Sequence, residues 1–597
     1  MRRALVIGVL APASLALIAA VSPLSPPDAA PDRPVDLVLL HGKIITVDAD
    51  DRIAQAVAIS GGRVVAVGTD ATIVRLAGLR TRRIDLKGLT VTPGLIDAHA
   101  HFSSGGADRL DVMSVAYPDV RSVGDVVERL RKRVATTPTG VFVQGAGWDD
   151  GKLAERRLLV ARDLDPASPN NPVYLTHTTG HFGVANSAAL ALANITRDTQ
   201  DPPNGTIDRY PDGSPTGVLK ESAQGLVRRL IPPRTSTQLE AGMRDLAKGF
   251  NAEGMTALKD PGVSQMAWAS YRKVLAEGGL TVRVFALWLG GNTERGARQL
   301  IAERAATTRP YESTGDDHLV SGGVKLYIDG SGGARTAWLY DDWNKDYTGV
   351  DTGNRGYPAS SPDTIRHLIR MFHDAGMHVS VHSIGDRGID WVVDSYAGAL
   401  KANPIKGLRH GIIHANIPTD HAIDVMAELQ RSYDAGYPEP SATFTWWLGD
   451  TYAANFGPGR SLRLNPFRTY LAKGVRWANG SDFYVTPFAA RYGIWAAVAR
   501  EPLLGTYAKD PFGRAESVDV HTALRAVTIW AARQLFLEKK IGSIEAGKYA
   551  DLAVWDRDPY TVPTAQLKDM QCQMTIFEGR IVYRAPTSPI TTSPAAP

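Results

Sequence analysis

The sequence contains a single cysteine, Cys572, among its 597 residues. One cysteine excludes a disulfide within the chain and a cysteine-based metal cluster, so any metal site must use histidine, carboxylate or modified lysine side chains. The formal net charge is only +4 and no dense run of lysine and arginine occurs, so nothing indicates a nucleic-acid partner. Hydrophobic residues make up 44 % and charged residues 21 %, which is typical of a globular rather than a disordered chain.

Long hydrophobic runs are missing after the N-terminus. There, Arg2 and Arg3 precede an apolar run that begins at Ala4 and ends at Val21, and a Pro/Ala/Ser-rich segment follows. This layout predicts that residues 1–33 are a signal peptide and Pro-rich linker. We therefore expect an exported protein, periplasmic or extracellular, with no stable membrane association after cleavage. An N-terminal membrane anchor is the alternative, because the run is near the lower length for a span.

Both ends of the chain carry short strand-like segments. In residues 34–90, AVAIS and RVVAVG flank Gly61-Gly62, which is a hairpin signal. In residues 536–584, ADLAVWD and MTIFEGRIVYR are strand-like. Short strands need a partner sheet, so we expect the two ends to form one small composite β-sandwich. The polar, Pro-rich residues 585–597 are predicted to be a disordered tail.

Residues 91–535 alternate between apolar runs and helical patterns. Repeated strand–helix units predict an α/β fold with a parallel sheet, and their number favours a closed (β/α)₈ TIM barrel. Clear helical patterns occupy residues 363–376 and 521–538. An insertion is expected around residues 182–250, near the active-site face. Candidate strands after the first one lie at 141–148, 172–181, 255–262, 283–290, 324–330, 378–386, 408–416 and 475–483.

Polar side chains interrupt or end several of these strands. In TPGLIDAHAHF, His99 and His101 are two residues apart, and such residues share one face of a strand, where they can hold one metal ion. A pair of surface or core histidines is the alternative. Chemistry in a barrel lies at the carboxyl ends of the strands. At or near those ends the sequence also places Lys325, His382, His414 and Asp482.

The residue types at these positions favour a metal site. Four imidazoles and a carboxylate suit Zn²⁺ or a similar divalent ion, in one or two copies. Lys325 is unusual in that company, since an ammonium repels a metal. Either Lys325 is neutral and carboxylated by CO₂, giving an anionic ligand that bridges two metals, or it holds the substrate as a cation. Burial beside metal cations lowers the pKa of a lysine, which favours the first interpretation.

Six motifs spread over the chain resemble those of a known enzyme family. They are TPGLIDAHAHF, VKLYIDGSGGARTAW, HSIGDRGID, RHGIIH, NGSDFYVTPF and IGSIEAGKYADLAVWDRDP. Together they resemble the amidohydrolase superfamily, and most closely its amidohydrolase 3, or YtcJ-like, branch, over residues 36–584. The resemblance implies a metal-bearing (β/α)₈ barrel beside a β-sandwich built from both chain ends. It also implies hydrolysis of C–N bonds other than peptide bonds.

The resemblance assigns roles to individual positions. It makes Lys325 a carboxylated bridge and Asp482 both a metal ligand and the catalytic acid/base. One position departs from the pattern: relatives often carry glutamate where this chain has Ile413, so a partner that tunes the metal site is missing. The remaining metal ligands implied by the resemblance are His99, His101, His382 and His414.

Five further residues are predicted to contact the substrate, which is expected to be a small molecule. Trp148 and Asp149 end a candidate strand, and His181 ends another. Asp329 and Arg335 are candidates for binding a substrate carboxylate, with a structural role in their loop as the alternative. We expect a hydrolase that cleaves a small N-acyl or cyclic amide with metal-activated water. The alternatives are a metal-dependent esterase, lactonase or isomerase, or an inactive exported binding protein. A homodimer is left open.

Overall fold

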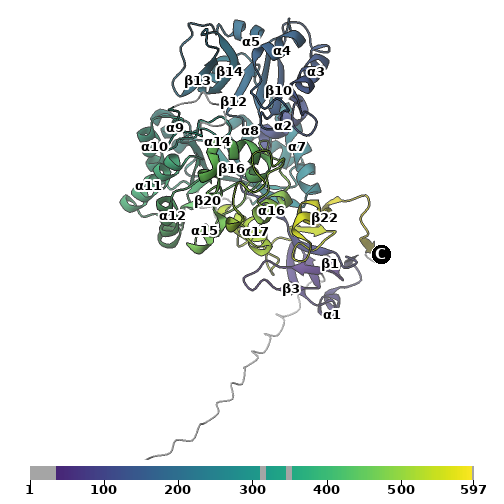
Figure 1. Cartoon of the computed structure of the whole chain (residues 1–597). Coiled ribbons are helices and arrows are strands. Elements are labelled where there is room, and N and C mark those ends of the chain that lie inside the picture. The colour runs from purple at the N-terminus through teal and green to yellow at the C-terminus, as the bar shows by residue number, and fades with distance from the viewer. Residues whose placement is uncertain (1–34, 309–316, 345–352, 594–597) are drawn as a thin grey trace, which may run out of the picture.

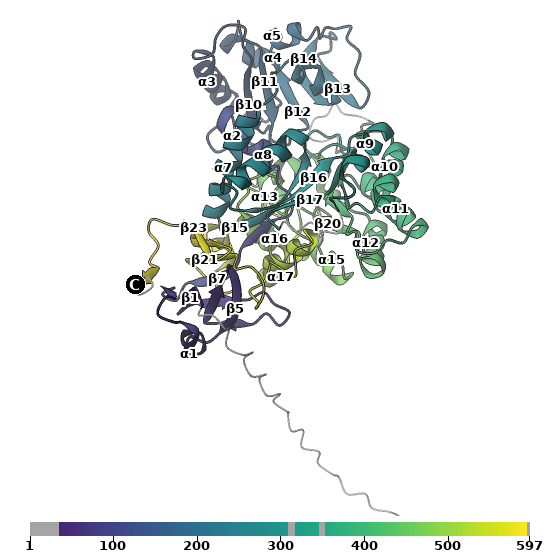
Figure 2. The same ribbon diagram turned by 180° about the vertical axis from the view of Figure 1, so that it is seen from behind.

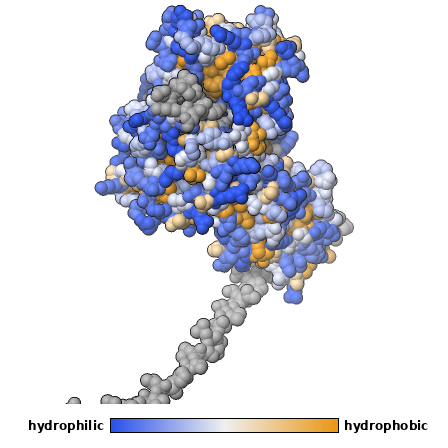
Figure 3. Space-filling model, in the orientation of Figure 1, coloured by the Kyte–Doolittle hydropathy of each residue, from blue (hydrophilic) through white to orange (hydrophobic). Residues whose placement is uncertain are grey.

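The structure, a computed structural model, describes residues 35–308, 317–344 and 353–593. The predicted signal peptide and linker lie outside the described residues. Within those three ranges, no helix combines the length and the hydrophobicity that a membrane span requires. An inserted sheet, a barrel and a sandwich follow one another from top to bottom in Figure 1. On the face shown in Figure 3, hydrophobic residues form small patches among hydrophilic ones.

A seven-stranded parallel sheet forms most of the barrel. The strands are largely runs of buried apolar residues, as expected where both faces of a sheet are covered. The predicted α/β barrel is thus confirmed. One strand, β20 (Tyr437–Glu439), was not predicted, because the sequence GYPEP around it is typical of a turn. In spatial order the strands are β8 (Leu95–Asp97), β15 (Met255–Val263), β16 (Arg283–Leu289), β17 (Leu319–Tyr327), β18 (Val379–Ser383), β19 (Gly411–His414) and β20 (Tyr437–Glu439).

Residues 478–483 close the ring between β20 and β8 without forming a regular strand. On one side the Gly480 amide donates to the Pro440 carbonyl at 3.1 Å. On the other side the Asp482 amide donates to the His99 carbonyl at 2.7 Å. The sequence predicted a strand at this position. The segment lies where the strand was expected, between β20 and β8, but it is irregular, and it contains Asp482.

Helices surround the barrel, as the two views in Figures 1 and 2 show. Polar side chains cap the start of several of these helices. The Thr235 side chain accepts from the Gln238 amide at the start of α7 (Ser236–Ala252). Ser264 and Thr419 cap the starts of α8 (Gln265–Ala276) and α12 (Asp420–Tyr433) in the same way. The predicted helix at 521–538 is divided into α17 (Val520–Ala526) and α18 (Ile529–Gln534). The main covering helices are α7 (Ser236–Ala252), α8 (Gln265–Ala276), α10 (Pro362–Asp374), α11 (Asp386–Ala402) and α12 (Asp420–Tyr433).

A separate six-stranded sheet is inserted between β8 and α7. The candidate strands at 141–148 and 172–181, assigned to the barrel from the sequence, belong to this sheet, so the insertion begins well before residue 182. It also ends earlier than predicted, because α7 covers the barrel. A short, helix-covered strand has the same pattern in either sheet, which explains the misassignment. The strands are β9 (Met113–Ser114), β10 (Val143–Trp148), β11 (Val173–His177), β12 (Phe182–Ala185), β13 (Gly205–Arg209) and β14 (Pro215–Glu221).

The two chain ends form the sandwich. β7 (Thr90–Pro93) from the N-terminal part pairs antiparallel with β21 (Leu552–Trp555) from the C-terminal part. One sheet therefore contains strands from both ends of the chain, as predicted. One sheet has the order β24 (Thr591–Ser593), β6 (Arg82–Asp85), β1 (Leu37–Leu40), β4 (Ala56–Ser60) and β5 (Arg63–Gly68). The other has the order β23 (Arg580–Arg584), β22 (Cys572–Phe577), β21 (Leu552–Trp555), β7 (Thr90–Pro93), β2 (Lys43–Ile45) and β3 (Ile53–Ala54).

The hairpin predicted in the sandwich is present, whereas the C-terminal tail differs from its prediction. Gly61 and Gly62 both have positive φ and join β4 to β5, which confirms the predicted hairpin. The tail predicted to be disordered contains β24, which pairs with β6. The composition of the tail did not reveal that β6 offers an open edge, to which a short segment can add.

Candidate metal centre and active site

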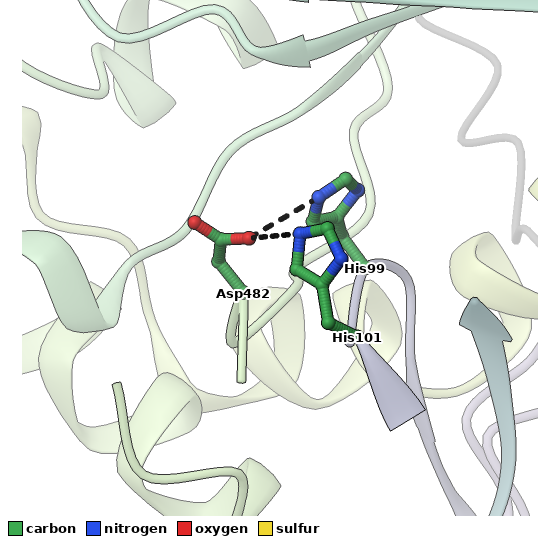
Figure 4. Close-up of side chains that lie close together, drawn as sticks. All are labelled: His99, His101 and Asp482. Atoms are coloured by element: carbon green, nitrogen blue, oxygen red, sulfur yellow. Dashed lines mark ion pairs between the residues drawn. The ribbon is translucent and has the colours of Figure 1, made fainter. Parts of the chain in front are cut away.

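His99, His101 and Asp482 meet at the carboxyl end of the barrel (Figure 4). The two histidines follow β8, and Asp482 lies in the segment that closes the ring. Asp482 Oδ1 lies 3.2 Å from His99 Nε2 and 3.3 Å from His101 Nε2. One ligand atom from each residue falls within 4.8 Å of the other two, a spacing that one metal ion can bridge.

The other predicted ligands lie around this group. The ring centroid of His414, at the end of β19, is 5.2 Å from that of His99 and 4.7 Å from that of His382 on β18. Lys325 on β17 lines the same cavity as His382 and Asp482. The structure therefore brings all six residues to one end of the barrel. Their roles as ligands remain predictions.

The polar atoms of the site fit a metal ion. His99 is fully buried and neither of its ring nitrogens has a hydrogen-bond partner, and His414 Nδ1 also lacks one, among the described residues. His99 Nε2 lies close to Asp482 Oδ1, but the pair does not have hydrogen-bond geometry. Buried imidazole nitrogens without partners are costly unless something binds them, and a divalent cation would do so.

Burial sets the charge state of these side chains. It lowers the pKa of His99 well below its usual value, with the Lys325 charge adding to the effect. Burial also lowers the pKa of His414 to about 3, despite the nearby Asp482. Burial opposes ionisation of Asp482, but the neighbouring imidazoles of His414, His101 and His99 hold its pKa well below the usual range. Neutral imidazoles beside a carboxylate are the forms that bind metal.

Lys325 is buried beside aromatic and imidazole rings. Its Nζ lies 4.6 Å from the centroid of the Tyr327 ring. Burial lowers the pKa of Lys325 to about 7, although Asp482 acts in the opposite direction. Burial therefore favours the neutral amine, which is the form that reacts with CO₂.

The glutamate that is missing at Ile413 has a counterpart on the next strand. Ile413 lies beside Glu439 in the register of β19 and β20. Glu439 is fully buried and pairs with Lys259 on β15 at 2.9 Å, and it also accepts from Ser380 at 3.0 Å. A carboxylate thus remains in the barrel interior, although it comes from another strand. No local sequence pattern predicts this ion pair, because its members are 180 residues apart.

Asp97 holds the two halves of the site together. Its Oδ1 accepts from the His99 amide at 3.0 Å and from the Ser481 amide at 2.9 Å. Its Oδ2 accepts from the Ser481 hydroxyl at 2.6 Å. Asp97 therefore fixes the backbone on both sides of the contact between His99 and Asp482. It lies inside the quoted motif TPGLIDAHAHF, but its spacing from the histidines gave no indication of this role.

Five of the six residues, all except the fully buried His99, line a cavity of about 530 Å³, a size typical of small-molecule sites. The insertion contributes Thr179, His181, Glu221, Gln224 and Arg228 to its wall. His181 was predicted to contact the substrate, and its position on the wall is compatible with that role.

Glu221 is a further site residue, which the sequence analysis missed. Both of its carboxylate oxygens lie 3.0 Å from His181 Nδ1, and Thr336 donates to Oε1 at 2.5 Å. Because Glu221 engages Nδ1, the Nε2 atom of His181 is the nitrogen left for a ligand. The two residues lie 40 positions apart, at the adjoining ends of the paired strands β12 and β14, and no local pattern pairs them.

The other four residues that were predicted to contact the substrate are less accessible from the cavity than His181. Asp329 lines the cavity, but its oxygens accept the backbone amides of Trp338, Ile384 and Gly385, which indicates a structural role in its loop. Trp148, Asp149 and Arg335 are buried and are not among the residues that line the cavity. Their contact with a substrate stays a prediction that the cavity does not support.

Asp149, Asp150 and His177 form a second buried group with metal-ligand spacing. Lys152 Nζ lies 3.0 Å from Asp149 Oδ2, and Thr451 donates to Asp149 Oδ1 at 3.0 Å. The ammonium of Lys152 thus occupies the position of a cation and compensates the carboxylates. This group links the insertion to the loops of the barrel and does not resemble an open metal site.

Comparison with known proteins identifies the family. The model of the amidohydrolase family matches residues 82–583. N-substituted formamide deformylase of Arthrobacter pascens is 29 % identical over 564 residues, which cover 92 % of this chain and 98 % of the relative. YtcJ of Bacillus subtilis (strain 168) is 27 % identical over 554 residues, covering 91 % and 98 % of the two chains.

Solved structures agree on the fold. The crystal structure of an uncharacterized metal-dependent hydrolase from Pyrococcus horikoshii OT3 has a TM-score of 0.67 and 23 % identity, and the match covers 89 % of this chain and 99 % of that one. The family match extends over most of the sequence and includes the barrel, the insertion and much of the sandwich. The chain therefore belongs to the amidohydrolase family of hydrolytic enzymes.

Proposed function

We propose that this enzyme hydrolyses a C–N bond, other than a peptide bond, in a small N-acyl or cyclic amide. The observation that carries the proposal is the convergence of three imidazoles, Lys325 and Asp482 on one cavity, with His99 against Asp482 and its ring nitrogens buried and without hydrogen-bond partners. The full-length similarity to a protein named N-substituted formamide deformylase supports an amide as the substrate.

The ligand set suits one or two divalent cations, and zinc fits the preponderance of nitrogen donors. His99, His101, His382, His414 and Asp482 would hold the metal. Such a cation supplies Lewis acidity and lowers the pKa of water. Lys325 would join them as a carbamate, formed when its neutral amine adds CO₂ and releases a proton.

Asp482 is the proposed acid and base. The amide substrate lies with its carbonyl carbon near the carboxylate, and Asp482 accepts a proton from the attacking water. Asp482 then passes that proton to the leaving nitrogen, which departs as a neutral amine. The Asp97 contacts to His99 and Ser481 keep the carboxylate at the reacting centre. His181, held by Glu221, would orient the substrate from the part of the wall beside His382, whose ring centroid is 5.0 Å away.

The replacement Asp482→Asn tests this assignment. Asparagine keeps the shape and one oxygen donor but accepts no proton at the operating pH, so kcat should fall by about 10²- to 10⁴-fold. Metal content, measured by elemental analysis, should stay near that of the parent protein. Full activity of the variant would remove Asp482 as the acid and base.

A substrate panel decides between bond types. Matched amides and esters with the same acyl group should show hydrolysis of the amides. If esters or lactones alone are hydrolysed, the enzyme is an esterase on the same scaffold. If nothing is hydrolysed by metal-loaded protein, a binding protein without activity becomes the better account.

Export is proposed from the N-terminal sequence alone. Two arginines, an apolar run and a Pro/Ala/Ser-rich segment support a cleaved signal peptide. N-terminal sequencing of protein recovered from outside the cytoplasm would give a mature start after the apolar run that ends at Val21, within the Pro/Ala/Ser-rich segment. Recovery of the intact N-terminus in the membrane fraction would favour an anchor.

A further inference from the structure

A second cavity of about 350 Å³, called the side cavity below, adjoins the catalytic cavity. The two cavities share the lining residues His101, Leu289 and Tyr327. Because His101 belongs to the metal site, the boundary between the cavities lies at the reacting centre. The side cavity therefore lies next to the proposed reacting centre, within reach of a substituent on a molecule held beside Asp482.

Small and apolar residues make up most of the wall of the side cavity. Met266 and Leu289 are 47 % and 54 % exposed, so a ligand in the side cavity would remove their apolar surface from water. The wall consists of Leu239, Pro261, Gly262, Met266, Ala267 and Leu289, together with Ser103, Ser104, Ser264 and Arg234 and the shared residues His101 and Tyr327.

The charges of the two cavities differ. Among the described residues of the side-cavity wall, Arg234 carries the permanent charge, and Asp108 forms an ion pair with it. The catalytic cavity instead contains Glu221, Arg228 and Asp482 in addition to its histidines. The catalytic cavity thus suits the polar reacting group, and the side cavity suits an uncharged group attached to it.

We propose that the side cavity is the subsite for an uncharged, apolar substituent on the amide nitrogen, so that the substrate is a small N-alkyl or N-aryl amide. This inference rests on the proposed function. It places the reacting amide in the catalytic cavity beside Asp482 and the apolar substituent on its nitrogen over Met266 and Leu289. Specificity then depends on the size of the leaving amine more than on the size of the acyl group.

Two substrate series test the proposal with metal-loaded enzyme. In one series the formyl group is constant and the N-alkyl chain grows from methyl to hexyl. In the other the N-methyl group is constant and the acyl chain grows. In the first series kcat/KM should rise about two- to fourfold per buried methylene until the cavity is full, and the second series should show no such rise.

Variants of the side-cavity wall test whether the dependence of kcat/KM on the N-alkyl chain length arises in that cavity. Met266→Ser and Leu289→Ser should each reduce the ratio of kcat/KM for the hexyl and methyl formamides about fivefold or more. Leu192→Ser is the matched control, because Leu192 is 53 % exposed and does not line the side cavity. The control should keep the parent ratio, and circular dichroism and metal content should show that all three variants are folded and loaded.

The outcomes separate this inference from the proposed function. If amides are hydrolysed but the ratio is the same in the parent and in both side-cavity variants, the subsite is wrong and the proposed function stands. A rise that follows the acyl chain also overturns the subsite. If the parent enzyme hydrolyses no amide in either series, both proposals are wrong.

Discussion

Two residues of the site, His414 and Asp482, have a backbone conformation that L-residues rarely adopt. Their φ angles are 70° and 55°. Holding a non-glycine residue in this region costs about 1–3 kcal/mol, and such residues recur at active sites. Both side chains point into the group around His99. The strained backbone is therefore compatible with a functional site, although positive φ also occurs at residues outside it, such as His41 and Asn194.

Replacing Lys325 by alanine tests the proposed carbamate. The variant should lose metal and activity, because an anionic ligand is removed from a buried site. If the carbamate is the ligand, a short carboxylate such as propionate should enter the space and restore part of both. Metal content and kcat, measured with and without propionate, check this. Metal content near that of the parent protein would show that Lys325 is not a ligand.

At the scale of strands and helices, the buried pair Lys259–Glu439 joins β15 to β20 across the barrel interior. Removing one member of a buried pair leaves an uncompensated charge. Lys259→Met should therefore lower the free energy of unfolding by about 3–5 kcal/mol. In the double variant Lys259→Met/Glu439→Gln, the neutral amide still accepts from Ser380, so most of the loss should be recovered. Urea denaturation of the parent and both variants provides the measurement.

The strands also show which features of the fold could be predicted from the sequence. Apolar runs located the strands β15 to β19, and the polar residues at their ends identified the six converging side chains. The pattern did not reveal which sheet a strand joins, so β10 and β11 were placed in the barrel. Nor did it reveal partners that folding alone brings together, such as His181 with Glu221. Hydrophobic periodicity reports burial, whereas pairing depends on the path of the chain.

At the scale of the whole molecule, Arg283 connects the barrel to the C-terminal half of the sandwich. Its guanidinium, on β16, donates to Asp551 at 2.8 Å and to Glu578 at 2.8 Å, and it is almost fully buried. Partial burial alone would raise the pKa of Glu578, but the hydrogen bond from His318 and the charge of Arg283 lower it to about 2. The ionised carboxylate therefore stabilises the joined barrel and sandwich.

This coupling predicts a dependence of stability on pH. A carboxylate whose pKa is lowered on folding contributes stability above its unfolded pKa, about 4.3 for glutamate, and loses it as pH falls toward the folded value. Glu578→Gln should cost on the order of 2 kcal/mol at pH 7. The gap between the parent and the variant should stay constant from about pH 7 to 5.5 and narrow by pH 3.5.

Urea denaturation at several pH values measures this gap. Glu501→Gln serves as the control, because Glu501 forms a surface pair with Arg514 and its side chain is 50 % exposed. The control should change stability little at any pH. A gap for Glu578→Gln that does not change between pH 5.5 and 3.5 would show that the carboxylate does not couple the barrel to the sandwich as described.

The central claim is that the residues at the carboxyl end of the barrel bind the catalytic metal. Anomalous diffraction from crystals of the metal-loaded protein tests it most directly. The account predicts a metal peak about 2.0–2.2 Å from the ligand nitrogens of His99 and His101 and from an Asp482 oxygen, the usual zinc distances. A peak at the group of Asp149, Asp150 and His177, with none at His99, would contradict the account.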